Sequence, residues 1–118
     1  MNKRAVGTTY EQIAGEYLES KGARIIERNY RCRHGEIDLI LLDGEILVFV
    51  EVKYRKNRNY GYPEEAVSKN KRRKIVLVSG YYRMQKHYGD NVPVRFDVVS
   101  ILGDTIHWVK NAFSYDDI

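Results

Sequence analysis

Three charged residues border the most apolar stretch of the chain, GEIDLILLDGEILVFVEVK, at residues 35–53. Asp38 lies near its start, and Glu51 and Lys53 lie near its end. Charged groups are costly to bury unless something compensates them. A hard divalent cation such as Mg²⁺ or Mn²⁺ binds carboxylates that share a site, and a neighbouring amine can steer a water or stabilise a developing negative charge. These residue types therefore favour metal-assisted hydrolysis of a phosphodiester.

This chemistry requires two adjacent strands that bring the acids together. We expect strands at residues 36–42 and 45–53, joined by a two-residue Asp-Gly turn at residues 43–44. That turn would place Glu36 directly across from Glu51, because the turn fixes the register of a hairpin. The site thus depends on a register that the turn residues decide.

In this register, Asp38 and Glu51 are diagonal neighbours on one face, and Lys53 shares that face. The carbonyl of Val52 could add a further metal ligand. Glu36 would be a supporting residue at best, paired with Lys53 or a nearby arginine. The alternative for Glu51 and Lys53 is a solvated, salt-bridged strand end, although the apolar run indicates a central strand.

The rest of the chain predicts the elements that surround this hairpin. Helical periodicity, with Thr8 or Thr9 as N-cap and Gly22 as the stop, indicates the first helix. The expected elements outside the hairpin are a helix at 8–22, a strand at 23–32, a helix at 68–88 starting at Ser68, and strands at 94–102 and 105–110. The order predicts a single α/β domain over residues 1–118, with helices flanking a mixed sheet.

Composition narrows the class of protein. Lys and Arg number 20 against 16 Asp and Glu, which gives a net charge of +4 and mildly favours an anionic partner. Cys32 is the only cysteine, so no intrachain disulfide forms. The N-terminus has no apolar signal core, and the run ILVFV is far shorter than a membrane span. We expect a cytoplasmic protein with no membrane partner.

Two basic runs, YRKNR and KNKRRK, are candidates for contact with a nucleic-acid backbone. Within them we expect phosphate contacts from Arg55, Lys71 and Arg72. Three tyrosines could stack on unpaired bases or simply pack the loop: Tyr54, Tyr60 and Tyr62.

Other polar residues receive a structural interpretation. Cys32 and His34 are too few for a zinc site, and Asp97 is expected to pair with an arginine. Glu11 has two readings. Thr8 and Glu11 match a capping box, yet Glu11 also lies on the flank of the apolar helix face, where it could look toward the sheet.

The chain resembles the YraN-type family of uncharacterised bacterial proteins. The match lies in the segments GTTYEQIAGEYL, RNYRCRHGEIDLILLDGEILVFVEVKYR, GYPEEAVSKNKRRKI, VRFDVV and the final AF. That family is assigned to the restriction-endonuclease-like superfamily of Asp…(Asp/Glu)-x-Lys nucleases and is similar in its core to Holliday-junction resolvases. The resemblance implies an α-β-β-β-α-β core.

The resemblance also implies roles for individual residues. Asp38, Glu51 and Lys53 would form the nuclease triad, and Glu11 would be a fourth acid near the metal. We therefore expect a Mg²⁺- or Mn²⁺-dependent endonuclease that acts on DNA, selective for branched structures over sequence. By analogy with resolvases, a homodimer would supply two sites for two strands. The alternatives are a non-catalytic nucleic-acid-binding module on the same fold, and a structural or protein-interaction domain.

Overall fold

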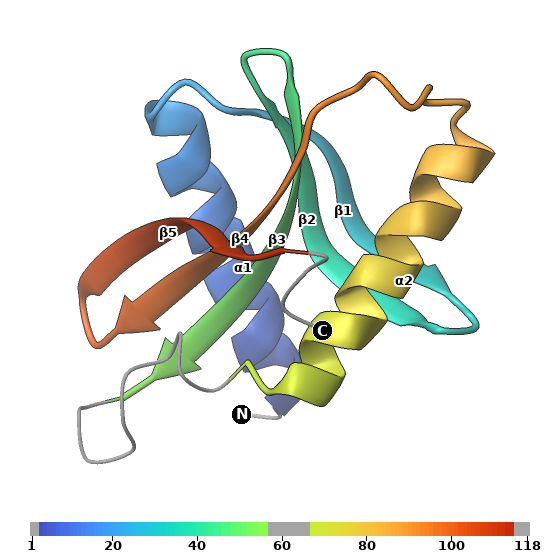
Figure 1. The fold of residues 1–118 in the computed structure, drawn as a ribbon. Helices are drawn as coiled ribbons and strands as arrows, with labels where there is room; N and C mark the ends of the chain where they lie inside the picture. The colour runs from blue at the N-terminus through green and yellow to red at the C-terminus, as the bar shows by residue number, and fades with distance from the viewer. Residues whose placement is uncertain (1–2, 57–66, 115–118) are drawn as a thin grey trace.

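The computed structural model describes residues 3–56 and 67–114, with side chains from Thr9 onward in the first helix. Two helices and five strands make up this part of the chain (Figure 1). In chain order they are α1 (Lys3–Ser20), β1 (Arg24–Cys32), β2 (Gly35–Asp43), β3 (Ile46–Arg55), α2 (Lys69–Gln85), β4 (Val94–Leu102) and β5 (Thr105–Phe113). The predicted α/β class is confirmed, and the elements begin with the expected α-β-β-β-α-β order.

The strands form one five-stranded sheet in the order β1-β2-β3-β4-β5. Neighbouring strands are antiparallel except β3 and β4, which are parallel. A parallel pair needs a long crossover connection, and α2 lies in the connection between β3 and β4. The sheet is therefore mixed, as predicted, with the apolar strand β3 at its centre.

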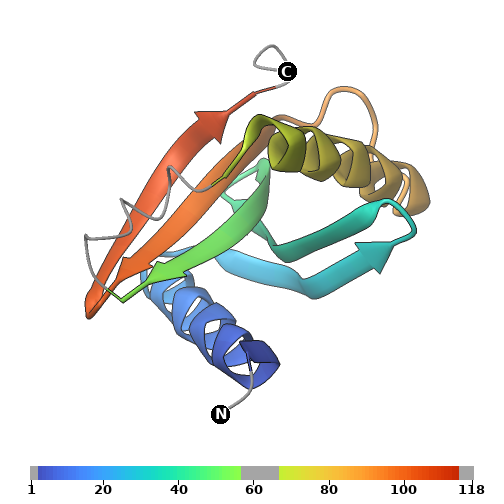
Figure 2. The same cartoon turned by 90° about the horizontal axis from the view of Figure 1, so that it is seen from below.

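The two helices cover opposite faces of the sheet (Figure 2). On one face, Ala14 and Leu18 of α1 pack against buried side chains such as Val48 and Val50. On the other face, α2 packs against a second buried cluster that includes Phe49 and Phe96. None of the described helices is long and apolar enough to cross a membrane. Strand β3 thus contributes alternate residues to two separate cores.

Helix α1 begins earlier than its sequence pattern indicated. The predicted N-cap at Thr8 or Thr9 is wrong, because the helix already begins at Lys3. Lys, Arg and Ala are strong helix formers, so the segment before Thr8 continues the helix toward the N-terminus. Glu11 therefore lies in the third turn of α1, and the capping-box reading of this residue is excluded. Gly22, with φ +97°, follows the helix as expected.

The hairpin between β2 and β3 turns one residue later than predicted. Asp43 pairs with Ile46, which leaves Gly44 and Glu45 as the turn residues. Gly44 has φ +62° and occupies the first central position, as in a type II′ turn. The expected pairing of Glu36 with Glu51 is wrong, since a later turn slides the two strands past each other.

Helix α2 confirms its predicted start. The Ser68 side chain caps the helix by accepting the backbone N–H of Lys71 at 3.2 Å. The helix ends at Gln85, before the predicted residue 88, because His87 adopts a left-handed φ of +60°. In β5, Phe113 is 2% exposed and its ring stacks on that of Phe96.

Candidate active site

Asp38 lies where strand β2 changes the face that its side chains present. Ile37 belongs to the core beneath α2, whereas Leu39, two residues later, belongs to the core beneath α1. Side chains two apart on a regular strand share a face, so the strand twists sharply at Asp38. The register of β1 on β2 leaves Asn29 opposite Asp38, and Asn29 has a left-handed φ of +52°. Both strands therefore bend together at this pair.

The bend directs the Asp38 carboxylate toward the backbone of β3. Direct pairing between β2 and β3 ends at Leu39 and Val50, and the next free N–H, that of Val52, donates to Asp38 Oδ2 at 2.8 Å. The N–H and carbonyl of one strand residue point to the same edge, so the Val52 carbonyl also faces β2. Asp38 is 9% exposed, and burial raises its pKa.

Glu51 lies near Asp38 on the next strand. Pairing ends at Leu39 and Val50, in a register two residues from the predicted one, and the Asp38 carboxylate binds the N–H of Val52, the residue that follows Glu51. Glu51 is only 5% exposed, so it is not part of a solvated strand end. Burial, followed by the negative charge of Asp38, raises the pKa of Glu51 to about 7. The charge of Asp38 therefore acts on Glu51.

Two ammonium groups lie beside the Glu51 carboxylate. Lys53 Nζ is 3.4 Å from Glu51 Oε1, which confirms that residues 51 and 53 share a face. Lys71 Nζ, from the first turn of α2, is 3.9 Å from the same oxygen. Both lysines lower the pKa of Glu51 without cancelling the effect of burial. The site therefore combines two buried acids with two amines.

Glu11 approaches the same site from α1. Burial, followed by the nearby charge of Asp38, raises the pKa of Glu11 to about 7. Hydrogen bonding between the two carboxyl groups raises the pKa of Glu11 and lowers that of Asp38, so the two acids act on each other directly. Asn29 also hydrogen-bonds Glu11 and favours its charged form. Glu11 thus faces the sheet, as the second of its two readings proposed.

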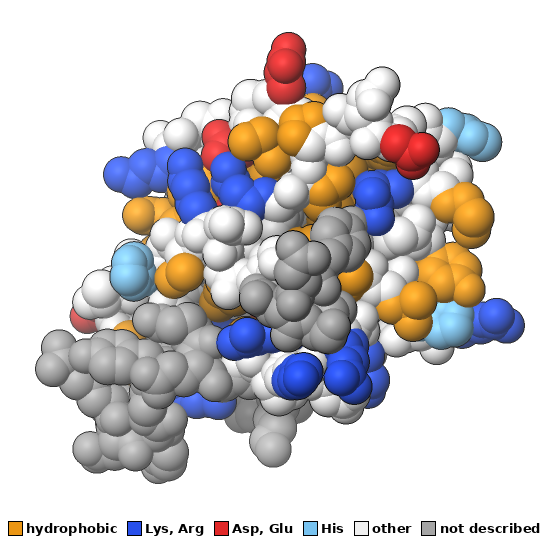
Figure 3. Space-filling model, viewed as in Figure 1, with side chains coloured by type: hydrophobic (Ala, Val, Ile, Leu, Met, Phe, Trp, Pro, Cys, Tyr) orange, Lys and Arg blue, Asp and Glu red, His pale blue; other side chains and the backbone are white. Residues whose placement is uncertain are grey.

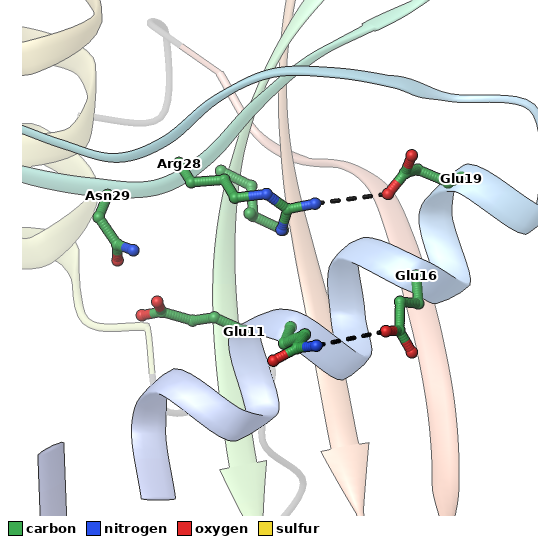
Figure 4. Close-up of a pocket in the computed structure, with 7 residues that line it drawn as sticks. Glu11, Glu16, Glu19, Arg28 and Asn29 are labelled. Atoms are coloured by element: carbon green, nitrogen blue, oxygen red, sulfur yellow. Dashed lines mark hydrogen bonds and ion pairs between the residues drawn. The ribbon is translucent and has the colours of Figure 1, made fainter. Parts of the chain in front are cut away.

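A groove of about 370 Å³ runs between α1 and β1 beside Glu11. Figure 4 shows Glu11 extending toward Asn29, while Arg28 extends toward Glu19. The Arg28 guanidinium lies so close to Gly15 that a Cβ there would be 2.6 Å from Nη1. The lining residues are Glu11, Gln12, Glu16, Glu19, Arg28, Asn29 and Leu39.

Glu36 does not join the acidic pair directly. Its carboxylate is 3.0 Å from Arg31 Nε, across the β1–β2 ladder, and neither Lys53 nor Arg33 is its partner in an ion pair of the described chain. Its charge still raises the pKa of Glu11 and Asp38. Glu36 therefore influences the site only through the negative charge of its carboxylate.

The donor set fits a hard divalent ion. Across residues 3–56 and 67–114, no three His, Cys, Asp or Glu side chains form a group that could hold a metal. The acids are instead engaged by other groups, since Glu11 contacts Asp38 and Glu51 is ion-paired with two lysines. Two carboxylates and a carbonyl are the all-oxygen ligands, completed by water or phosphate, that suit Mg²⁺ and Mn²⁺.

The predicted phosphate-binding residues differ in their surroundings. Arg72 donates to the Val67 carbonyl at 3.0 Å and lies over the Phe113 ring, and Arg55 donates to a backbone carbonyl at 2.9 Å. Lys71 instead lies at the acidic pair. Figure 3 shows Lys and Arg side chains gathered around the start of α2. The predicted stacking residues Tyr60 and Tyr62 lie outside the described residues, whereas Tyr54 stacks on Tyr10 with ring centroids 3.7 Å apart.

Asp97 has the structural role that its sequence context indicated. It is fully buried, and Arg95 donates to both of its oxygens at 2.8–3.2 Å. The Trp108 indole and the backbone N–H of Asn111 complete its hydrogen bonds at 2.8 and 2.9 Å. This carboxylate is satisfied within β4 and β5 and contributes no free ligand.

Two features of the site escaped sequence reasoning. Asn29 is one, and its signal was an asparagine in a strand, where this residue is depleted and often takes positive φ. The other is the contact between Lys71 and Glu51, which no local pattern signals because 20 positions separate them.

Comparison with known proteins identifies relatives along nearly the whole chain. The model of the uncharacterised protein family UPF0102 matches residues 10–101. A UPF0102 protein of Lachnoclostridium phytofermentans is 47% identical over 113 residues, covering 96% of each chain. A UPF0102 protein of Fusobacterium nucleatum is 42% identical over 118 residues, covering 100% of this chain and 98% of its own. One from Vibrio campbellii is 44% identical over 116 residues, covering 96% and 95%.

Proposed function

The chain belongs to the uncharacterised protein family UPF0102, and from its buried acidic pair we propose that it is a divalent-metal-dependent nuclease. The family assignment confirms the resemblance carried by the sequence motifs but names no activity. The proposal instead depends on the chemistry of Asp38, Glu51 and Lys53, which come from two neighbouring strands.

One observation supports the proposal most strongly. Asp38 binds the N–H of the residue next to Glu51, and the two acids are 9% and 5% exposed, so two negative charges here repel. A structural ion pair would favour the ionised acid, whereas here burial and the charge of Asp38 raise the pKa of Glu51 even beside two lysines. Selection for stability alone gives no reason to keep such a pair, and a divalent ion between the acids would remove the conflict.

Each residue has a distinct task in this proposal. Asp38, Glu51 and the Val52 carbonyl would hold the ion, which when bound supplies a Lewis acid for a phosphate oxygen and a more acidic water. The hydrogen bond from Val52 N–H fixes the Asp38 carboxylate in place. Lys53, anchored on Glu51 at 3.4 Å, would orient the attacking water or stabilise the charge that develops on phosphorus oxygens. Glu11 would complete the ligand shell through water.

The start of α2 supports a polyanionic substrate. Its first turn contains no acidic residue, and the basic residues of its first two turns are Lys69, Lys71, Arg72, Arg73 and Lys74. Cations at a helix N-terminus oppose the macrodipole and destabilise the helix. A phosphate backbone passing this end would relieve the repulsion, while carrying its scissile bond toward Glu51.

The substrate is expected to be DNA recognised by shape. The described residues offer phosphate contacts but few groups arranged to read base edges, which favours a branch or flap over a sequence. A homodimer would supply two sites for the two strands of a junction.

The second candidate function is a non-catalytic nucleic-acid-binding module. The contact of both Lys53 and Lys71 with one oxygen of Glu51 favours it, because two ammonium groups partly neutralise the acid without any metal. In that case the basic face would bind phosphates and no bond would be cut.

A cleavage assay separates these functions. Purified protein is mixed with labelled branched, single-stranded and duplex DNA and with RNA, and Mg²⁺ or Mn²⁺ is titrated in. We expect cutting that depends on the metal, is abolished in Glu51→Gln, and survives in Glu45→Gln, a matched change at the exposed turn between β2 and β3. Binding without cutting under every metal would instead establish the non-catalytic module.

A further inference from the structure

Lys71 is expected to contact the phosphates of a nucleic acid, and its position in the structure is unusual for that role. The Ser68 cap holds its backbone N–H at 3.2 Å, which fixes where its side chain leaves α2. From there Lys71 Nζ reaches Glu51 Oε1 at 3.9 Å, and its side chain is 34% exposed. This residue in the first turn of the basic helix is therefore partly buried beside Glu51.

Lys71 acts on both carboxylates of the pair. Its charge favours the ionised forms of Glu51 and of Asp38, whereas the contact of Lys53 is with Glu51. A cation that addresses both acids has the electrostatic role that a divalent ion would have between them. Lys53 comes from the same strand as Glu51, but Lys71 comes from a separate helix and can leave without disturbing the sheet.

An ammonium on Oε1 and a divalent ion on the same carboxylate compete. A Mg²⁺ or Mn²⁺ ion sits about 2 Å from its carboxylate oxygen, far closer than Lys71, and two cations on one oxygen repel in a site this buried. The lysine that is released has an obvious new partner, because substrate phosphate would lie at the same end of α2.

We propose that Lys71 is a resident counter-ion of the acidic pair, that a divalent ion displaces it from Glu51, and that the freed ammonium then binds a substrate phosphate. This inference rests on the proposed metal-dependent function and adds an order of binding, in which the metal ion binds before the substrate. The site becomes ready for substrate only once the ion is loaded, because phosphate and Glu51 cannot both hold Lys71.

Mn²⁺ affinity measured without nucleic acid tests the proposal directly, by titration calorimetry or by the electron-spin resonance of free Mn²⁺. Lys71→Met removes the competing charge, and Lys74→Met removes the same charge from an exposed position on the same helix. At about pH 8.5, where protons compete less for Glu51, we expect Lys71→Met to bind Mn²⁺ about tenfold more tightly than the wild type and more tightly than Lys74→Met. Lys71→Arg keeps the competing charge and should restore wild-type affinity.

The outcomes distinguish this proposal from the proposed function. If Glu51→Gln abolishes Mn²⁺ binding but Lys71→Met and Lys74→Met bind alike, the metal site stands and the counter-ion role is overturned. If neither the wild type nor Lys71→Met takes up Mn²⁺, both proposals fail. Thermal unfolding of each variant without metal verifies that it is folded, and Lys71→Gln replaces Lys71→Met if the apolar side chain prevents folding.

Discussion

Glu51→Gln should make the metal-free protein more stable at neutral and alkaline pH. The pKa of Glu51 rises from 4.5 to about 7 through burial and the charge of Asp38, a net effect that already includes the two lysines. The folded protein therefore holds this proton more tightly than the unfolded chain. Stability from this group is complete below pH 4.5 and is lost as the pH rises through about 7. The shift corresponds to about 3 kcal/mol, which glutamine avoids because it cannot ionise.

Urea denaturation in the presence of a chelator measures this effect, at about pH 5 and at about pH 8. We expect the wild type to lose stability between the two conditions while Glu51→Gln changes less, so that the variant is the more stable protein at the higher pH. Mn²⁺ should then restore the wild type and leave the variant unchanged. A variant less stable than the wild type at about pH 8 would refute the reasoning, because it would show that Glu51 is a structural partner of Lys53 and Lys71.

Three further variants test the remaining roles. Lys53→Met should lower the cleavage rate about 10²–10⁴-fold in the assay with labelled DNA while leaving DNA affinity within about twofold; an equal loss of affinity would contradict a role in chemistry. Asp97→Ala should destabilise the protein by about 3–5 kcal/mol in urea denaturation, because it removes the fully buried carboxylate that accepts hydrogen bonds from Arg95, Trp108 and Asn111. Ser68→Ala should cost about 1 kcal/mol through loss of the α2 cap, and an unchanged melting temperature would argue against that cap.

The elements of this fold could be predicted because their signals are local. Strand β4 has the predicted bounds of Val94–Leu102, since its apolar run ends at a glycine turn. The start of α2 at Ser68 follows from a single capping side chain. Asp97 could be assigned to an arginine because a buried carboxylate beside a basic residue is otherwise costly.

The register of the hairpin could not be settled in the same way. Glycine suits the second central position of a type I′ turn and the first central position of a type II′ turn. Gly44 could therefore form the turn with Asp43 before it or with Glu45 after it, and the structure has the second arrangement. The choice shifted the register by two residues, so that Val50 pairs with Leu39 and Glu51 no longer lies across from Glu36. The start of α1 was missed for a different reason, because Thr8 resembles a cap although the helix continues past it.

The sequence predicted only some of the residues that form the site. Strand alternation was enough to group Asp38, Glu51 and Lys53. In the structure Lys53 is 3.4 Å from Glu51, and Asp38 binds the backbone N–H between those two residues. The bend at Asn29 and the reach of Lys71 to Glu51 depend on packing between elements far apart in sequence. Such contacts leave no periodic pattern, so only the three-dimensional structure reveals them.

The central claim is that Asp38 and Glu51 together hold a divalent ion. A crystal structure of the protein soaked in Mn²⁺, with anomalous diffraction collected at the manganese edge, tests it most directly. The account predicts one anomalous peak between the two carboxylates, within about 2.0–2.4 Å of an oxygen from each and near the Val52 carbonyl. A Mn²⁺-bound crystal with its peak elsewhere, or with the acidic pair still held by Lys53 and Lys71, would contradict it.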